Sequence, residues 1–250
     1  MRTFVKILVI VLVVTVACGV GIGWFLYYSP DLPDMNGLVE FAPAQVVRVS
    51  DPCLTTATIA IPYESIGNNL RAALSAAETR GDDREVLANL YLGFKDRVPR
   101  GSTLSTQISR SMFCAPSTTV NRAVGELRMA AQLERRFSRQ ELFTIFANRA
   151  WFGDGQVGVQ SASQYFFQKD PNQLQIGEAA LLAGLIRAPA RLSPLAHPDR
   201  ALERRNEVLD AMVARHAISA EEGAIAKASS LGVVIKKIGR VVHRIFPLRG

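Results

Sequence analysis

The chain has 250 residues and a formal net charge of +7, with 48% hydrophobic and 20% charged residues. This composition excludes a disordered tail, and the length suffices for one sizeable hydrophobic core. Three Cys and three His, with neither a CxxC pair nor an HExxH run, argue against a disulfide-dense miniprotein, a structural zinc site or a zinc protease. The excess of Lys and Arg over Asp and Glu indicates an anionic partner, which could be nucleic acid, a membrane surface or a phosphate-bearing substrate.

The first feature along the chain is an uncharged apolar run of 22 residues at 7–28. About 20 such residues cross a bilayer as a helix, whereas the apolar part of a signal peptide is about 7–15 residues long. Arg2 and Lys6 precede the run and Asp31 and Asp34 follow it, which places the N-terminus in the cytoplasm and the rest outside. We therefore expect an uncleaved single-pass anchor over residues 1–29. A domain outside the cytoplasm would not meet nucleic acid, so we expect no such partner.

Residues 30–60 predict a juxtamembrane linker. It contains Pro and Asp, and its two short β-like runs, at 45–49 and 56–61, are compatible with one small hairpin. Residues 61–216 predict one mostly helical domain, because apolar residues recur there at helical spacing.

Within that domain the periodicity predicts helices at 69–79, at 122–137 and, after a glycine-rich loop, at 159–167. Residues 178–186 are almost wholly apolar and predict a central core helix, and Pro198 predicts the start of a long helix to about residue 216. The S-x-x-E pattern of a capping box predicts two further helix starts, at Ser138 and Ser219.

Residues 217–250 predict a C-terminal helix followed by a basic tail. As a helix, the tail would be amphipathic and would suit an anionic membrane surface; a solvated terminus is the alternative. Its basic residues are Lys236, Lys237, Arg240, Arg244 and Arg249.

The stretch Gly101-Ser-Thr-Leu-Ser-Thr-Gln-Ile-Ser-Arg110 resembles the second motif of the peptidoglycan glycosyltransferases, glycosyltransferase family 51. Further segments resemble other parts of the family in the same order. Residues 122–126 resemble its third motif and residues 132–148 its fourth. Residues 158–167 and 178–189 resemble its core helices, and residues 204–209 resemble its fifth motif. The resemblance implies a mainly α, lysozyme-like helical domain with a small membrane-facing lobe, behind the single N-terminal transmembrane helix.

The family joins the 4-hydroxyl of an acceptor sugar to the anomeric carbon of a lipid-linked disaccharide, with inversion and release of polyprenyl pyrophosphate. The resemblance implies the same reaction here, on a lipid II-type substrate at the outer or periplasmic face of the bacterial plasma (inner) membrane. It also implies contact with membrane lipids and with other cell-wall synthesis proteins. No penicillin-binding module is recognised after residue 215, so we expect a monofunctional enzyme.

The reaction explains why the matching residue types are needed. A sugar hydroxyl needs a carboxylate to take its proton, and Glu78 falls where the family has that base. Pyrophosphate leaves without an acid if cations hold its charge, and Lys95, Arg110 and Arg122 match the family's basic positions. Glu126 matches a second carboxylate that orients the donor or helps bind a divalent metal. For each of these, an ordinary solvated charge is the alternative.

Neutral hydrogen bonds to the substrate would come from Ser102, Thr103 and Gln107, the first two in a Ser- and Thr-rich turn whose backbone amides can face phosphate. The resemblance implies no required cofactor and no dedicated metal ligand set, although Mg²⁺ or Mn²⁺ beside Glu126 is compatible with it.

The first motif departs from the family. There the base is followed by Asp and then by an aromatic, a His and a Gly, whereas Thr79-Arg-Gly81 follows Glu78 here, and the segment to Gly101 is shorter. Elsewhere, Thr106 stands where the family has Gln, Arg110 where it has Lys, Ser111 where it has Asn, and Ala123 where it has Lys. Three hypotheses follow: a working glycan polymerase, a non-catalytic scaffold of wall synthesis, or a lytic hydrolase with a single Glu acid, which the basic cluster disfavours.

A polymerase makes a geometric demand. Its two carboxylates should lie at least about 6.5–9.5 Å apart across one groove, as in inverting glycosidases. The cations should lie beside Glu126 rather than Glu78, because a carboxylate paired with Arg is a poorer proton acceptor. Separately, a disulfide between Cys53 and Cys114 is permitted outside the cytoplasm, and a Cα–Cα distance above about 7 Å would exclude it.

Overall fold

A computed structural model describes residues 15–16, 19–20, 35–43, 45, 47–49, 58–78, 104–112 and 120–234. The described part is mainly helical, as the sequence predicts. In chain order its elements are η1 (Asn36–Phe41), β1 (Val47–Val49), β2 (Thr58–Ala60), η2 (Tyr63–Ile66), α2 (Asn68–Glu78), α4 (Leu104–Met112), α5 (Val120–Arg136), α6 (Arg139–Arg149), β3 (Trp151–Gly153), β4 (Gln156–Val157), α7 (Val159–Phe167), η3 (Pro171–Gln173), α8 (Ile176–Leu185), α9 (Pro189–Leu192), α10 (Pro198–Ala214) and α11 (Ala220–Ala228).

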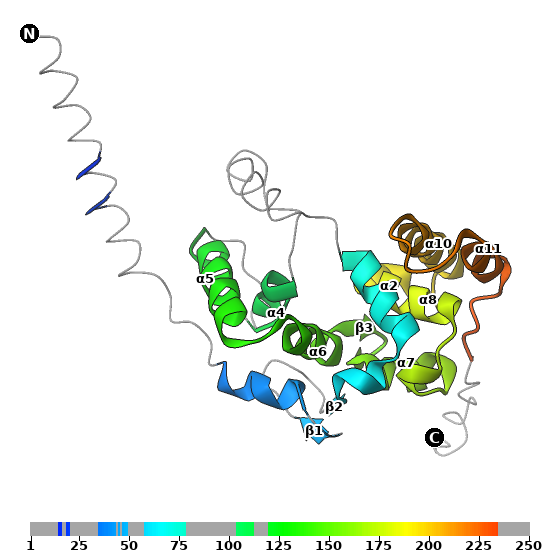
Figure 1. Ribbon diagram of the computed structural model, residues 1–250, viewed down its shortest axis with the longest axis horizontal. Helices are drawn as coiled ribbons and strands as arrows, with labels where there is room; N and C mark the ends of the chain where they lie inside the picture. Colours follow the sequence, from blue (N-terminus) through cyan, green and yellow to red (C-terminus); the bar gives the residue numbers. More distant parts are fainter. Residues whose placement is uncertain are drawn as a thin grey trace, which may run out of the picture.

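The helices form two groups joined in the middle (Figure 1). On one side α4 packs against α5, and on the other α2, α8, α10 and α11 pack together, with α6 between the groups and α7 next to α8. The core centres on α8, which is buried from Gly177 to Leu185 and contacts both α2 and α10. The prediction of a central apolar helix is therefore confirmed.

The strands are short and pair locally. β1 and β2 are antiparallel, with Val47 opposite Ala60, which confirms the expected pairing of the two β-like runs. β3 and β4 form a second antiparallel pair at the glycine-rich loop. Gly158, which follows β4, has φ +80°, and a Cβ there would lie 2.7 Å from the carbonyl oxygen of Asn148. Only glycine fits this close approach.

Both predicted capping boxes are present. The Ser138 hydroxyl accepts from the backbone N–H of Glu141 at 3.3 Å, and the Glu141 carboxylate accepts from the backbone N–H of Ser138 at 2.7 Å. Ser219 and Glu222 repeat this arrangement at 3.1 and 2.7 Å. The boxes satisfy backbone donors that have no partner inside the helix, so they fix where α6 and α11 begin.

The linker prediction needs a correction at residues 36–41. These residues form η1 and pack into the core, where Leu38 and Phe41 are each only 1% exposed. The physical reason is the buried amide of Asn148 in α6. Its Nδ2 donates to the carbonyls of Phe41 and Ile61, both at 2.9 Å, while its Oδ1 accepts from the Ile61 N–H at 3.1 Å.

The C-terminal helix α11 belongs to the same core, since it packs on α10 and α8 and buries Ala226. Arg205 of α10, which is fully buried, anchors it by donating to the carbonyl oxygens of Lys227, Ser229 and Ser230 at 2.8, 2.8 and 3.2 Å. Burial lowers the pKa of Arg205. The guanidinium also supplies hydrogen bonds to carbonyl groups at the end of α11 that have no partner inside the helix.

Several expectations fall outside the described residues. They are the anchor at 7–28 (apart from Thr15, Val16, Gly19 and Val20), the basic tail, Cys53 and Cys114. Within the described ranges, no helix has both the length and the apolar character needed to cross a bilayer.

We expect Asn148→Ala to lower the free energy of unfolding by about 3 kcal/mol, because it leaves three buried backbone groups of residues 41 and 61 without partners. Urea unfolding of the full chain measures the change. Asn172→Ala, at an exposed position, is the control and should change stability by less than about 0.5 kcal/mol. A loss below about 1 kcal/mol in Asn148→Ala would contradict the role of this amide.

Hydrogen bonds from the backbone and the hydroxyl of Ser138 lower the pKa of Glu141. A group with a lowered folded pKa stabilises the protein above its unfolded pKa, and this contribution disappears as the pH falls through the folded pKa. The wild type should therefore exceed Glu141→Gln in stability at pH 7, and the gap should close at acid pH. Chemical unfolding across this range tests the sign, with the exposed Glu203→Gln as control; a gap that widened in acid would refute the argument.

Candidate active site

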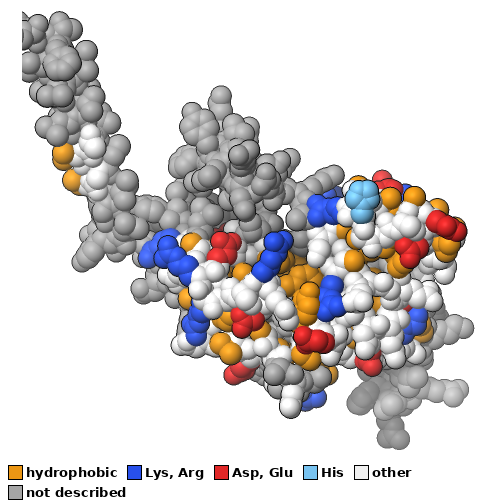
Figure 2. Space-filling model, viewed as in Figure 1, with side chains coloured by type: hydrophobic (Ala, Val, Ile, Leu, Met, Phe, Trp, Pro, Cys, Tyr) orange, Lys and Arg blue, Asp and Glu red, His pale blue; other side chains and the backbone are white. Residues whose placement is uncertain are grey.

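Charge on the visible surface is mixed. Figure 2 shows basic and acidic side chains interspersed on one face of the molecule, with a patch of hydrophobic side chains near its middle.

The contact between α4 and α5 is polar and specific. α4 buries the hydroxyl residues Ser105 and Ser109. The Ser105 Oγ donates to Glu134 Oε1 at 2.5 Å, and the Ser109 Oγ donates to the carbonyl oxygen of Glu126 at 2.8 Å. Their partners on α5, Glu134 and Glu126, lie about two turns apart and follow in reverse chain order. The two helices are therefore antiparallel, and the two bonds fix how α4 lies along α5.

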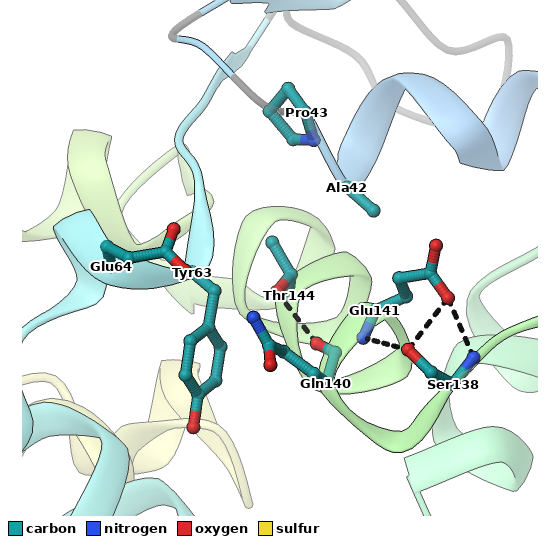
Figure 3. A pocket seen from close by; sticks show the side chains of 8 residues that line it. All are labelled: Ala42, Pro43, Tyr63, Glu64, Ser138, Gln140, Glu141 and Thr144. Carbon is teal, nitrogen blue, oxygen red and sulfur yellow. Dashed lines mark hydrogen bonds between the residues drawn. The ribbon is translucent and has the colours of Figure 1, made fainter.

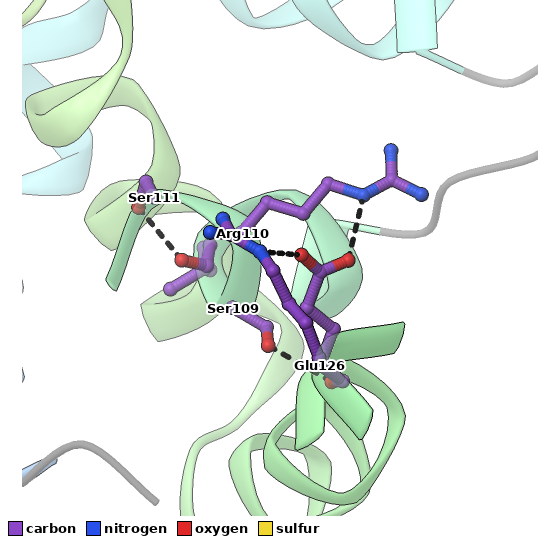
Figure 4. Close-up of polar contacts among 6 residues, drawn as sticks. Ser109, Arg110, Ser111 and Glu126 are labelled. Carbon is purple, nitrogen blue, oxygen red and sulfur yellow. Dashed lines mark hydrogen bonds and ion pairs between the residues drawn. The ribbon is translucent and has the colours of Figure 1, made fainter. Parts of the chain in front are cut away.

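Three of the predicted site residues meet where these helices touch (Figure 4). Arg122 precedes Glu126 by one turn on α5, and its Nε lies 2.8 Å from Glu126 Oε1. Arg110 reaches across from α4, with its Nε 3.2 Å from Glu126 Oε2. The side chains of Arg122 and Glu126 are 15% and 16% exposed, whereas that of Arg110 is 37% exposed. Two of the three predicted cations, Arg110 and Arg122, therefore lie beside Glu126, whereas Lys95 and the side chain of Glu78 lie outside the described residues.

The cluster is suited to holding an anion. Two guanidinium groups against one carboxylate leave a net positive charge. Each oxygen of Glu126 already accepts an N–H from an arginine, so both oxygens of this carboxylate are engaged. Figure 4 shows the terminal nitrogens of Arg110 pointing away from Glu126. A guanidinium presented in this way can bind phosphate oxygens through two parallel hydrogen bonds.

Of the other predicted site residues, Gln107 lies one turn before Arg110 on α4 and is half-buried. Glu78 is the last residue of α2, but its side chain lies outside the described residues, as do Lys95, Ser102 and Thr103. The expected Ser- and Thr-rich turn is corrected in part, because Ser105 and Thr106 lie inside α4. In the part of the chain that is described, no three His, Cys, Asp or Glu side chains gather closely enough to hold a metal.

Sequence reasoning missed Arg149, the last residue of α6. It is only 3% exposed, and its Nε and Nη2 donate to the hydroxyl and the carbonyl oxygen of Ser111, both at 3.3 Å. Its guanidinium also lies 4.9 Å from the ring centroid of Phe41. An arginine at a helix end is usually a surface charge. The only sequence indication for Arg149 was its position directly after the segment that resembles the fourth motif, which ends at Asn148.

A cavity of about 550 Å³ opens at the other end of α6 (Figure 3). Gln140, Glu141 and Thr144 come from α6 and face the end of η1 and the start of η2. None of the predicted site residues lines it, and Thr144, its last lining residue on α6, precedes Arg149 by five residues, an axial rise of roughly 7.5 Å. Its full lining is Ala42, Pro43, Tyr63, Glu64, Ser138, Gln140, Glu141 and Thr144.

Residues 56–213 match the family model described as transglycosylase. Penicillin-binding protein 1F of Bacillus subtilis is 36% identical over 154 residues, which cover 62% of this chain and 21% of that protein. Penicillin-binding protein 1A of Aquifex aeolicus is 32% identical over 236 residues, covering 87% and 32%. A crystal structure of penicillin-binding protein 1A from Haemophilus influenzae aligns with 42% of this chain and 16% of that one, at 36% identity and a TM-score of 0.37.

The chain thus spans about a fifth to a third of the length of these two curated relatives. The family match, by contrast, covers well over half of the 250 residues, including α4, α5 and the Arg110–Glu126–Arg122 cluster. The chain therefore belongs to the transglycosylase family, glycosyltransferase family 51.

Proposed function

We propose that this chain is a peptidoglycan glycosyltransferase that polymerises glycan strands. It would transfer a lipid-linked disaccharide to the 4-hydroxyl of an acceptor sugar, with inversion and release of polyprenyl pyrophosphate. The observation that carries the proposal is the Arg110–Glu126–Arg122 cluster, which lies on helices that the family match includes.

In this proposal the arginines hold the leaving group. Negative charge develops on the pyrophosphate as its bond to the anomeric carbon breaks, and fixed cations stabilise that charge without transferring a proton. Glu126 serves to align both guanidiniums, since one carboxylate oxygen is bonded to each. Lys95, Ser102, Thr103 and Gln107 would complete the donor site.

The general base in this proposal is Glu78. Glu78 is the last described residue of α2 and falls where the family has its base. Glu126 is a poor candidate for the same task because its oxygens are both engaged by arginine.

We also propose that the domain works at the outer face of the plasma membrane, anchored by residues 7–28 and in contact with membrane lipids and other wall-synthesis proteins. A second candidate function, a non-catalytic scaffold, is favoured by one observation: Thr79-Arg-Gly81 replaces the acidic and aromatic residues that follow the base in the family.

Polymerisation of lipid II by the purified full chain tests the proposal. We expect the wild type to form glycan polymer and Glu78→Gln to reduce the rate by about 100-fold or more, since a general base contributes this much. The matched control is Glu203→Gln, an exposed carboxylate on α10. Full activity of Glu78→Gln would refute the base, whereas an inactive wild type that still binds lipid II would favour the scaffold.

We propose that no metal is required, because two arginines already neutralise Glu126 and supply the positive charge for pyrophosphate. Polymerisation by EDTA-treated protein in chelator should then stay within about twofold of the rate with Mg²⁺ or Mn²⁺, as fixed cations already stabilise the leaving charge. A loss in chelator that Mg²⁺ or Mn²⁺ restores would contradict this.

A further inference from the structure

A buried arginine from another helix bonds to the last described turn of α4, in addition to the bond from Ser109 to α5. Arg149 of α6 donates to both polar oxygens of Ser111, its hydroxyl and its carbonyl, at 3.3 Å. The Ser111 hydroxyl meanwhile donates its own hydrogen to the carbonyl of Ile108 at 2.6 Å, so its lone pairs are left to accept from Arg149.

Arg110 is the residue directly before Ser111, and its own anchoring is slight. Its side chain is 37% exposed and meets Glu126 through Nε, at the longer of the two Arg–Glu distances. The position of the Arg110 guanidinium therefore depends on the position of the α4 backbone at Ser111. A shift or fraying of that last turn would carry the Arg110 guanidinium away from Glu126.

We infer that Arg149 is a positioning residue for Arg110. By fixing the end of α4, it holds the Arg110 guanidinium against Glu126, with its terminal nitrogens turned outward to an anion. The inference rests on the proposed function only for the identity of that anion, a pyrophosphate. Arg149 itself is 3% exposed and does not touch substrate.

Arginine suits this task better than lysine. The planar guanidinium reaches the Ser111 hydroxyl and carbonyl with two different nitrogens, and its face lies over the Phe41 ring. A lysine would keep the charge but lose the fork and the stacking. Arg149→Lys should therefore restore only part of what Arg149→Met removes.

The first test needs no substrate. The Nε–H signal of Arg110, assigned with Arg110→Lys, is followed by ¹⁵N NMR in the full chain. We expect Arg149→Met to shift or broaden it and Arg149→Lys to do so less. Arg205→Met is the matched control, because Arg205 is also fully buried and also donates to backbone carbonyls, but of residues 227–230. An Arg110 signal unchanged by Arg149→Met would overturn the inference. Ser111→Ala, which removes one of the two acceptors, replaces Arg149→Met if that variant fails to fold.

The second test measures farnesyl pyrophosphate binding by calorimetry in a double-mutant cycle. Arg149→Met should weaken binding about tenfold or more, since small displacements of an aligned group are costly. In an Arg110→Met background the same change should cost less than about twofold, because the effect passes through Arg110. Equal losses in both backgrounds would overturn the inference. No binding by the wild type would contradict the proposed function instead, and the NMR result would then decide the role of Arg149.

Discussion

The buried amide of Asn148 is the contact on which the rest of this structure depends. It uses both of its donor hydrogens and its acceptor oxygen on the backbone of Phe41 and Ile61, segments that enter the domain from either side of the β1–β2 pair. A buried polar group is stable only when its partners are all in place, so this amide permits one arrangement of η1, β2 and α6. Gly158 lies so close to the backbone carbonyl of Asn148 that a side chain at position 158 would not fit.

Arg149, the residue after Asn148, bonds to Ser111 of α4, and α4 places Arg110 beside Glu126. Two hydroxyl groups of α4 bond to α5, and hydrogen bonds have stricter geometry than the hydrophobic contacts beside them. The cationic cluster is thus supported from two sides, by α5 beneath it and by α6 at its end. In the proposed reaction, such preorganised charge would stabilise a departing pyrophosphate without reorganisation at the moment of transfer.

Much of this could be predicted from the sequence where the signal is local. The capping boxes at Ser138 and Ser219 and the Arg122–Glu126 pair depend on residues within four positions of one another, and the apolar core helix depends on one continuous run of 10 residues. The packing of η1 and the burial of Arg149 depend on partners 107 and 38 residues away. Sequence periodicity does not reveal such contacts, which is why residues 36–41 were predicted as a linker and Arg149 was not identified. Arg110 was identified only through its resemblance to the family motif.

The central claim is that Arg110 and Arg122, aligned by Glu126, hold the pyrophosphate while Glu78 acts alone as the base. An experimental structure of the full chain with a bound polyprenyl pyrophosphate tests it most directly. We expect the pyrophosphate on both guanidiniums, with the Glu78 carboxylate at least about 6.5 Å from that of Glu126 across the same groove. A pyrophosphate bound away from both arginines, or Glu78 turned out of that groove, would contradict the account.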